Sequence, residues 1–189
     1  MHVYLAGPEV FLPNAREVGE RKKSLCAQAG LIGLYPLDND FSATDGERLD
    51  QAIYRANRRM IEQADAGIFN LTPFRGCSAD VGTVFELGMM AGLGKPVFGY
   101  SSVAADLRAR VAGAKRHPDG VWRDAHGYLV EDFGNADNLM IDASLKEGGN
   151  AFLRVAGSGR IDDLEAFAAC VSRAASLLGA QAQPATCDR

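Results

Sequence analysis

Glu86 is the only charged residue in the apolar segment Val81–Gly94, whose sequence is VGTVFELGMMAGLG. A helix this apolar is buried on most sides, so a carboxylate within it loses hydration and needs a partner or a ligand. The segment also contains four glycines, each of which costs about 1 kcal/mol relative to alanine in a helix. They indicate that something approaches the helix backbone closely. Unless Glu86 points to water from a narrow polar stripe, its carboxylate is the one plausible nucleophile near a ligand.

Three other side chains are candidates for the same site. Asp80 stands where a loop meets the start of this helix, although an ordinary N-terminal cap would explain it equally well. Tyr4 lies in a strand that we expect to be buried, where it could simply be a core tyrosine with its hydroxyl at the edge. Asn57 lies on the apolar face of a predicted helix. A buried asparagine needs partners, so Asn57 either ties down a loop or meets a ligand.

Two short polar segments are harder to interpret from residue type alone. The run Leu37–Asp40 is Leu-Asp-Asn-Asp, which favours a simple turn. The run Asn138–Met140 predicts the start of a helix, with Asp137 or Asn138 as the cap. The sequence contains neither G-x-G-x-x-G nor G-x-x-x-x-G-K-[ST], so a dinucleotide or triphosphate site is not supported. No Ser/His/Asp order suggests a hydrolase triad.

The elements that must position these residues are strands and helices that alternate along the chain. The predicted strands cover residues 3–6, 31–35, 66–71 and 95–100. The predicted helices cover 15–29, 47–64, Ser78 or Asp80 to about 93, Ser101 or Ser102 to about 111, and 161–178. This alternation predicts an open parallel α/β sheet with helices on both faces. Such sheets bind ligands beyond the carboxyl ends of their strands, which directs attention to loops 7–14, 36–44 and 72–80.

The remaining segments complete a single predicted domain over residues 1–178. Residues 112–133 are rich in Gly, His, Asp and Arg and carry the only tryptophan, which indicates a long excursion or hairpin. Residues 179–189 are expected to form a flexible tail. With 189 residues, 47% of them hydrophobic, the chain is long enough to fold without a disulfide or metal staple.

Composition also excludes several classes of protein. The net charge of −4 argues against a nucleic-acid polymer as partner. No apolar run approaches the ~20 residues of a membrane-spanning helix, and the first residues do not resemble a signal peptide. The four cysteines are scattered, which predicts free thiols in the cytoplasm. Neither they nor the histidines have the spacing of a metal site, and we expect no metal.

Taken in order, six motifs resemble those of the nucleoside 2-deoxyribosyltransferases, and they span most of the chain. They are Tyr4–Pro8 with Phe11, Pro36–Asn39, Asn57 with Ala64–Ala66, Leu71–Gly76, Asp80–Gly88 and Asp137–Met140. The run from Asp80 to Glu86 is the specific part of this pattern. The resemblance implies a flavodoxin-like fold, in agreement with the open sheet expected from the alternation of elements, and no cofactor.

The resemblance also implies roles for individual residues. Glu86 matches the family's catalytic glutamate, which attacks the anomeric carbon of deoxyribose. Tyr4 matches the tyrosine that orients this glutamate, and Asp80 matches an aspartate that contacts substrate and handles the proton of the leaving base. The other positions match residues that bind substrate. They are Gly7, Phe11, Asp38, Asp40, Asn57 and Gly82 within the chain, and Asn138 and Met140, which a neighbouring subunit lends to the pocket.

The implied reaction is base exchange between a 2'-deoxynucleoside and a free nucleobase, through a sugar ester on Glu86 and with retention at the anomeric carbon. A homodimer, or a multiple of dimers with shared active sites, and a role in nucleotide salvage are further expectations. Some family members have aspartate in place of Asn57 and glutamine in place of Asp40, so purine or pyrimidine preference stays open. The alternatives are an N-glycosidase of nucleosides or their 5'-monophosphates, and a non-catalytic nucleotide-binding domain.

Overall fold

The computed structural model describes residues 1–39, 46–150 and 152–181. Within them, five parallel strands form one sheet, in the order β2-β1-β3-β4-β7. The strands are β1 (His2–Ala6), β2 (Ile32–Leu34), β3 (Ala66–Asn70), β4 (Val97–Ser101) and β7 (Leu153–Arg154). Numbered along the chain, this order is 2-1-3-4-5, which is the order of flavodoxin-like sheets. The predicted fold class is therefore confirmed.

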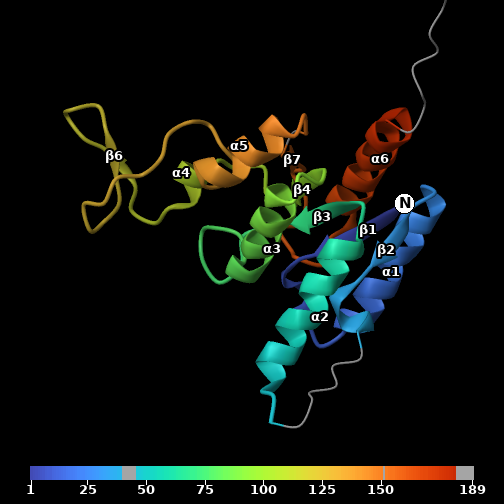
Figure 1. The fold of residues 1–189 in the computed structure, drawn as a ribbon. Coiled ribbons are helices and arrows are strands. Elements are labelled where there is room, and N and C mark those ends of the chain that lie inside the picture. The colour runs from blue at the N-terminus through green and yellow to red at the C-terminus, as the bar shows by residue number, and fades with distance from the viewer. Residues whose placement is uncertain (40–45, 151, 182–189) are drawn as a thin grey trace, which may run out of the picture.

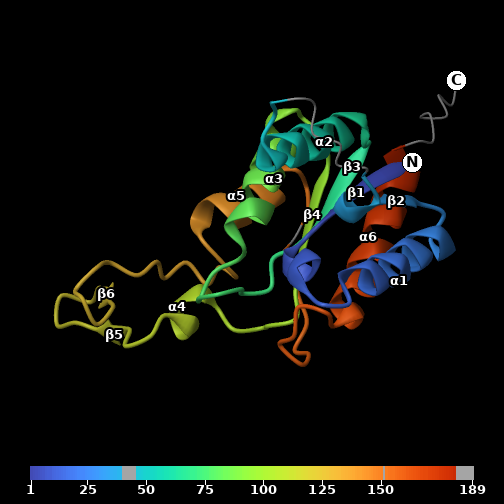
Figure 2. The same cartoon turned by 90° about the horizontal axis from the view of Figure 1, so that it is seen from below.

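Helices cover both faces of this sheet, as Figures 1 and 2 show. On one face lie α1 (Ala15–Gln28) and α6 (Leu164–Gln181), and on the other lie α2 (Leu49–Gln63), α3 (Val81–Gly92) and α5 (Leu139–Glu147). The central strands β3 and β4 are buried along their whole length because both of their faces are covered. This double cover explains why those strands read as continuous apolar runs in the sequence.

Alternation along β1 divides its side chains between two hydrophobic clusters. Val3 and Leu5 pack into the cluster under α1 and α6, whereas Tyr4 and Ala6 pack into the cluster under α2, α3 and α5. Successive side chains of a strand point to opposite faces, so this division follows from the strand itself. Tyr4 is thereby directed toward α3, the helix that carries Glu86.

Shorter elements complete the structure. The 3-10 helices η1 (Pro8–Phe11) and η2 (Pro36–Asp38) follow β1 and β2, and α4 (Leu107–Arg110) follows β4. The antiparallel strands β5 (Lys115–Arg116) and β6 (Trp122–Arg123) form a hairpin that projects away from the sheet and its helices (Figures 1 and 2). The predicted excursion over residues 112–133 is confirmed as this hairpin.

The helix predicted to begin at Ser101 or Ser102 is wrong. Ser101 ends β4, and Ser102 lies in a loop that side-chain hydrogen bonds hold in place. Its backbone N–H donates to Thr72 Oγ1 at 3.1 Å, and its hydroxyl donates to the carbonyl of Arg160 at 2.9 Å. These contacts replace the helical hydrogen bonds, so only α4 is helical in this segment.

The last helix begins three residues later than predicted, at Leu164. The preceding turn is closed by Asp163, whose carboxylate accepts hydrogen bonds from the backbone and hydroxyl of Ser158. The two-residue strand β7, which pairs with the end of β4, had no signal in the sequence. At the other end, α6 reaches Gln181, beyond the predicted end at residue 178, and residues 182–189 lie outside the described part of the chain.

Candidate active site

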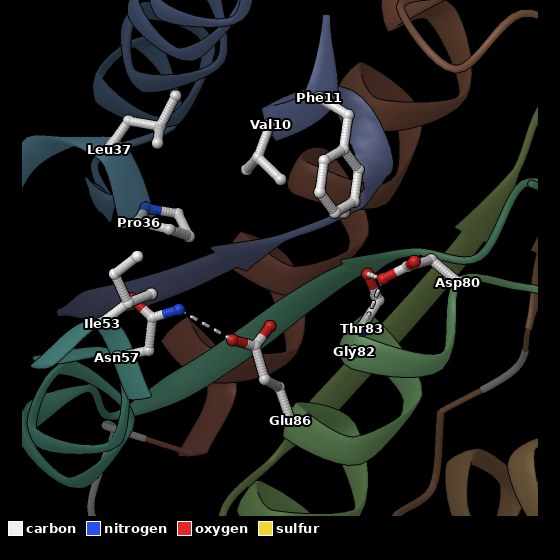
Figure 3. Close-up of a pocket in the computed structure, with 11 residues that line it drawn as sticks. Val10, Phe11, Pro36, Leu37, Ile53, Asn57, Asp80, Gly82, Thr83 and Glu86 are labelled. Carbon is white, nitrogen blue, oxygen red and sulfur yellow. Dashed lines mark hydrogen bonds between the residues drawn. The ribbon is translucent and has the colours of Figure 1, made fainter. Parts of the chain in front are cut away.

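A cavity of about 260 Å³ lies at the carboxyl edge of the sheet, at the switch point between β1 and β3. Parallel α/β sheets commonly bind ligands at this point. The cavity is lined by Gly7, Val10, Phe11, Pro36, Leu37, Ile53, Asn57, Asp80, Gly82, Thr83 and Glu86. Figure 3 shows the apolar side chains of η1 and η2 facing Glu86 across the pocket. Its volume is close to the lower end of the range typical of small-molecule sites.

Glu86 is held through only one of its two carboxylate oxygens. Oε1 accepts a hydrogen bond of 2.7 Å from the Tyr4 hydroxyl and one of 3.2 Å from Nδ2 of Asn57. The second of these bonds is drawn in Figure 3. Among the residues that the structure describes, none donates to Oε2. The carboxylate is therefore oriented by two elements, β1 and α2, while its second oxygen stays available to a ligand.

Burial dominates the electrostatics of this carboxylate. It raises the pKa of Glu86 to about 7, against the hydrogen bonds from Tyr4 and Asn57, which lower it, while the nearby charge of Asp80 raises it. Burial and the neighbouring Glu86 charge raise the pKa of Tyr4 well above its usual range, so its hydroxyl remains a donor. A carboxylate with a pKa near neutrality in a pocket is typical of a group that takes part in chemistry.

Asp80 both caps α3 and lines the pocket. Its Oδ2 accepts hydrogen bonds from the backbone of Thr83 at 2.9 Å and from the Thr83 hydroxyl at 3.0 Å. The expected N-terminal cap is thus confirmed, and it leaves Oδ1 without a donor among the described residues. A Cβ on Gly82 would come within 3.2 Å of Oδ2, so glycine keeps the space around this carboxylate open.

Gly7 lines the pocket directly after the end of β1. A Cβ at this position would meet Oε2 of Glu9 at 2.1 Å and Cβ of Asn70 at 2.6 Å. Both neighbours are completely buried and have little room to move. Glycine is therefore required here by close packing.

Phe11 forms a planar wall at the mouth of the pocket. Its ring stacks on that of Phe74, with centroids 5.5 Å apart and planes 4° from parallel. The guanidinium of Arg75 lies 4.9 Å from the Phe11 centroid and 4.6 Å from the Phe74 centroid. More than half of the Phe11 side chain remains exposed, which suits contact with a flat ligand.

Some of the predicted site residues do not reach the pocket within this chain. Asp38 turns away from it, because its carboxylate accepts hydrogen bonds from Lys23 Nζ at 2.9 Å and from the backbone of Tyr35 at 3.4 Å. These contacts confirm the turn that its sequence favoured, and place Asp38 outside the cavity lining. Asp40 lies outside the residues that the structure describes.

Asn138 and Met140 lie at the start of α5 and also do not line the cavity. The side chain of Asn138 caps α5 by accepting from the backbone of Met140 at 3.0 Å, and its Nδ2 donates to Glu131 at 2.8 Å. The predicted helix start is confirmed. Met140 is 70% exposed, so it is available to a surface other than that of its own pocket.

Sequence reasoning missed most of the apolar lining. Val10, Pro36 and Leu37 lie in the loops that were expected to face a ligand, but their residue types carry no chemistry that would mark them. Ile53 lies one helical turn before Asn57, and this spacing was the one available signal that it shares the same face. Thr83 also lines the cavity, because its backbone N–H and its hydroxyl both donate to the capping carboxylate of Asp80.

The part of the chain that the structure describes contains no group of three or more His, Cys, Asp or Glu side chains placed to hold a metal ion. Cys26, Cys77 and Cys170 are free thiols. None of the described helices combines the length and apolar character needed to cross a membrane.

Comparison with known proteins identifies the family of this chain. A model of the nucleoside 2-deoxyribosyltransferase family matches residues 3–140. An uncharacterised protein of Schizosaccharomyces pombe is 33% identical, with 78% of each chain covered. The structure of a 2-desoxiribosyltransferase from Leishmania mexicana has a TM-score of 0.64 at 31% identity, and covers 90% of this chain and 96% of its own.

A conserved protein from Enterococcus faecalis shares the fold, with a TM-score of 0.52 at 19% identity over 92% of this chain and 98% of its own. The family match runs from β1 into α5 and therefore includes every element that lines the pocket. The chain belongs to the nucleoside 2-deoxyribosyltransferase family.

Proposed function

We propose that this enzyme moves 2-deoxyribose from one nucleobase to another, with Glu86 as the group that carries the sugar. The two hydrogen bonds to Oε1 of Glu86 carry the proposal, because they orient the carboxylate and leave Oε2 free toward the pocket. In the first step Oε2 forms an ester bond to the anomeric carbon, and the bond from that carbon to the base nitrogen breaks. In the second step a nitrogen of another base attacks the same carbon and releases the carboxylate. Two displacements retain the configuration.

Asp80 is the proposed proton carrier for the base. It lies in the same pocket as Glu86, and its cap to Thr83 uses only Oδ2, so Oδ1 can give a proton to the leaving base and recover it from the incoming one. The sugar lacks a 2'-hydroxyl, whose electron withdrawal would oppose the positive charge that develops at the anomeric carbon. The carboxylate of Glu86, which lines the same pocket, favours that positive charge as it forms.

The lining of the pocket favours a nucleoside over a nucleotide. Within the described residues no lysine or arginine lines it, and its charged groups are the carboxylates of Glu86 and Asp80. These carboxylates would repel a 5'-phosphate, and the lining offers it no lysine or arginine to bind. The second candidate, an N-glycosidase, differs only in that water attacks the ester, so slow hydrolysis is expected as a side reaction.

We also propose that two subunits share each pocket, through Asn138 and Met140 of a neighbour. A second groove, between α2 and α3, reaches Glu86 from outside and is lined by Tyr54, Phe85 and Met89 among others. Phe85 is 59% exposed, and Val81 on the same helix is 84% exposed. A dimer, or a multiple of dimers, that buries this surface would gain apolar contact and close the pocket.

A cytoplasmic role in nucleotide salvage fits the reaction type and the free thiols.

Replacing Glu86 with alanine should abolish base exchange and leave the fold intact, because the lost group is the nucleophile. The assay mixes deoxyinosine with free adenine and measures deoxyadenosine, and circular dichroism checks the fold. Glu20→Ala, at an exposed acid of α1, is the control and should keep full activity. If Glu86→Ala retains more than about a tenth of the activity, which is an effect below ~1.4 kcal/mol on the barrier, the nucleophile is misassigned.

The ester on Glu86 should be trapped by a nucleoside whose sugar carries fluorine at the 2-position, since fluorine destabilises the cationic transition state of ester breakdown. Intact-mass measurement should show one sugar per chain, and peptide mapping should place it on the peptide that contains Glu86. If the enzyme is active but never shows an adduct, the prediction is wrong. Water or the second base would then attack the anomeric carbon directly, without an ester on Glu86.

The rate of the first step should rise with pH through about 7, because burial raises the pKa of Glu86 to about 7 and the ionised form attacks. Tyr4→Phe removes a hydrogen bond that lowers this pKa, so the rising limb should move to higher pH and kcat should fall about tenfold or more. Tyr128→Phe, at an exposed tyrosine of the hairpin, should change neither. An unshifted limb in Tyr4→Phe would make Tyr4 a packing residue only.

Mixing inactive Glu86→Ala with inactive Asn138→Ala should restore activity if subunits share pockets. A mixed dimer contains one pocket with both defects and one with neither, so random exchange should recover about a quarter of the original activity. Light scattering on the unmodified protein gives the oligomeric state. A fully active monomer would contradict the shared site.

A further inference from the structure

A fully buried ion pair lies directly behind the pocket and takes no part in the proposed chemistry. Glu9, in η1, accepts a hydrogen bond from Lys22 Nζ of α1, and both side chains are 0% exposed. Asn70, the last residue of β3, donates from Nδ2 to the other oxygen of Glu9 at 2.8 Å. The ammonium of Lys22 also faces the rings of Phe167, at 4.6 Å, and Tyr100, at 5.7 Å.

Stability alone does not explain why these charges are buried. Taking an acid and an amine out of water costs several kcal/mol each, and apolar residues of similar size often replace such pairs without loss. Directional hydrogen bonds between buried polar atoms can in addition fix the relative position of the elements that they join. Glu9, Lys22 and Asn70 connect η1, α1 and the carboxyl end of β3.

Each of these connections leads to the pocket. Gly7, Val10 and Phe11 surround Glu9 in the chain and all line the cavity. Few backbone hydrogen bonds hold η1, among them Val10 N to Gly7 O at 3.5 Å and Leu12 N to Glu9 O at 3.1 Å. A single 3-10 turn of this kind is weakly stable by itself, so its position depends on an outside anchor.

Asn70 extends the same anchor to the next loop. Its Oδ1 accepts from the backbone of Thr72 at 3.1 Å, and its Nδ2 also donates to the carbonyl of Ile161 at 2.9 Å. Thr72 begins the loop that continues to Phe74, the stacking partner of Phe11. One buried cluster therefore joins η1, which carries Phe11, to the loop that carries its stacking partner Phe74.

We propose that Glu9 and Lys22 are positioning residues that hold η1, and with it Phe11, against the pocket and so determine affinity for the nucleoside. Neither residue lines the cavity, and the bonds that orient Glu86 come from Tyr4 and Asn57. Loss of the pair should therefore weaken substrate binding while leaving the reacting groups in place. This proposal rests on the proposed nucleoside substrate.

The test is the double variant Glu9→Met/Lys22→Met, which removes both charges and approximately conserves volume. Its Tm should stay close to that of the original protein, whereas KM for deoxyinosine should rise about tenfold or more with kcat within about threefold, as expected for lost binding energy. Lys22→Met alone leaves a buried carboxylate unpaired and should lower Tm steeply, so recovery in the double variant shows that the stability effect comes from charge.

Hydrogen exchange gives a readout that does not depend on activity. Peptides covering residues 7–14 should exchange faster in the double variant, while those covering β3 and β4 should not. Glu9→Gln keeps the size but leaves the buried ammonium of Lys22 without its counter-charge, so it should show the same faster exchange together with a lower Tm. Glu20→Gln, which breaks the exposed pair with Lys23 on the same helix, should show none.

Unchanged KM and unchanged exchange in both Glu9 variants would overturn the positioning role. If the original protein shows no base exchange in this assay, the proposed function fails instead, and the exchange of residues 7–14 alone then decides whether the ion pair holds η1.

Discussion

The whole site depends on one constraint, which is that a buried carboxylate must be hydrogen-bonded and yet keep a free oxygen. Glu86 meets it by accepting both of its hydrogen bonds on Oε1. The donors come from a strand and from a separate helix, so the carboxylate is held only when β1, α2 and α3 are all in place. The same burial that demands these partners raises the pKa of Glu86 to about 7, so the carboxyl group can change its protonation near neutral pH.

The order of the sheet brings these elements together. The strands β1 and β3 are neighbours, but the chain leaves β1 for α1 on one face of the sheet and leaves β3 for α3 on the other. The loops that follow the two strands therefore separate and leave a cavity at the carboxyl edge of the sheet. The alternation of side chains along β1 sends Tyr4 toward α3, and the N-terminus of α3 places Asp80 beside Glu86. Behind this arrangement, the buried pair of Glu9 and Lys22 joins the loop after β1 to the body of the protein.

Much of the fold could be predicted because local pattern and tertiary environment agree in most elements. Central strands that are covered on both faces read as apolar runs, and Asp80 could be recognised as a cap from its place before an apolar helix. The predictions failed where tertiary contacts compete with local preference. Ser102 is held by Thr72 and Arg160 rather than by helical bonds, and β7 is a strand only because β4 offers it an edge.

At the site, residue types and their order along the chain are enough to show that Glu86 is an isolated acid in an apolar helix and that the motifs around it follow the order of a family. The sequence left open whether Asn57 ties down a loop or meets a ligand, and only the tertiary structure shows that it donates to Glu86. It gave no reason to single out Lys22, because a helical lysine is ordinarily solvated. The structure alone decided these points, since hydrogen bonds between residues 82 or 29 positions apart depend on how the elements pack.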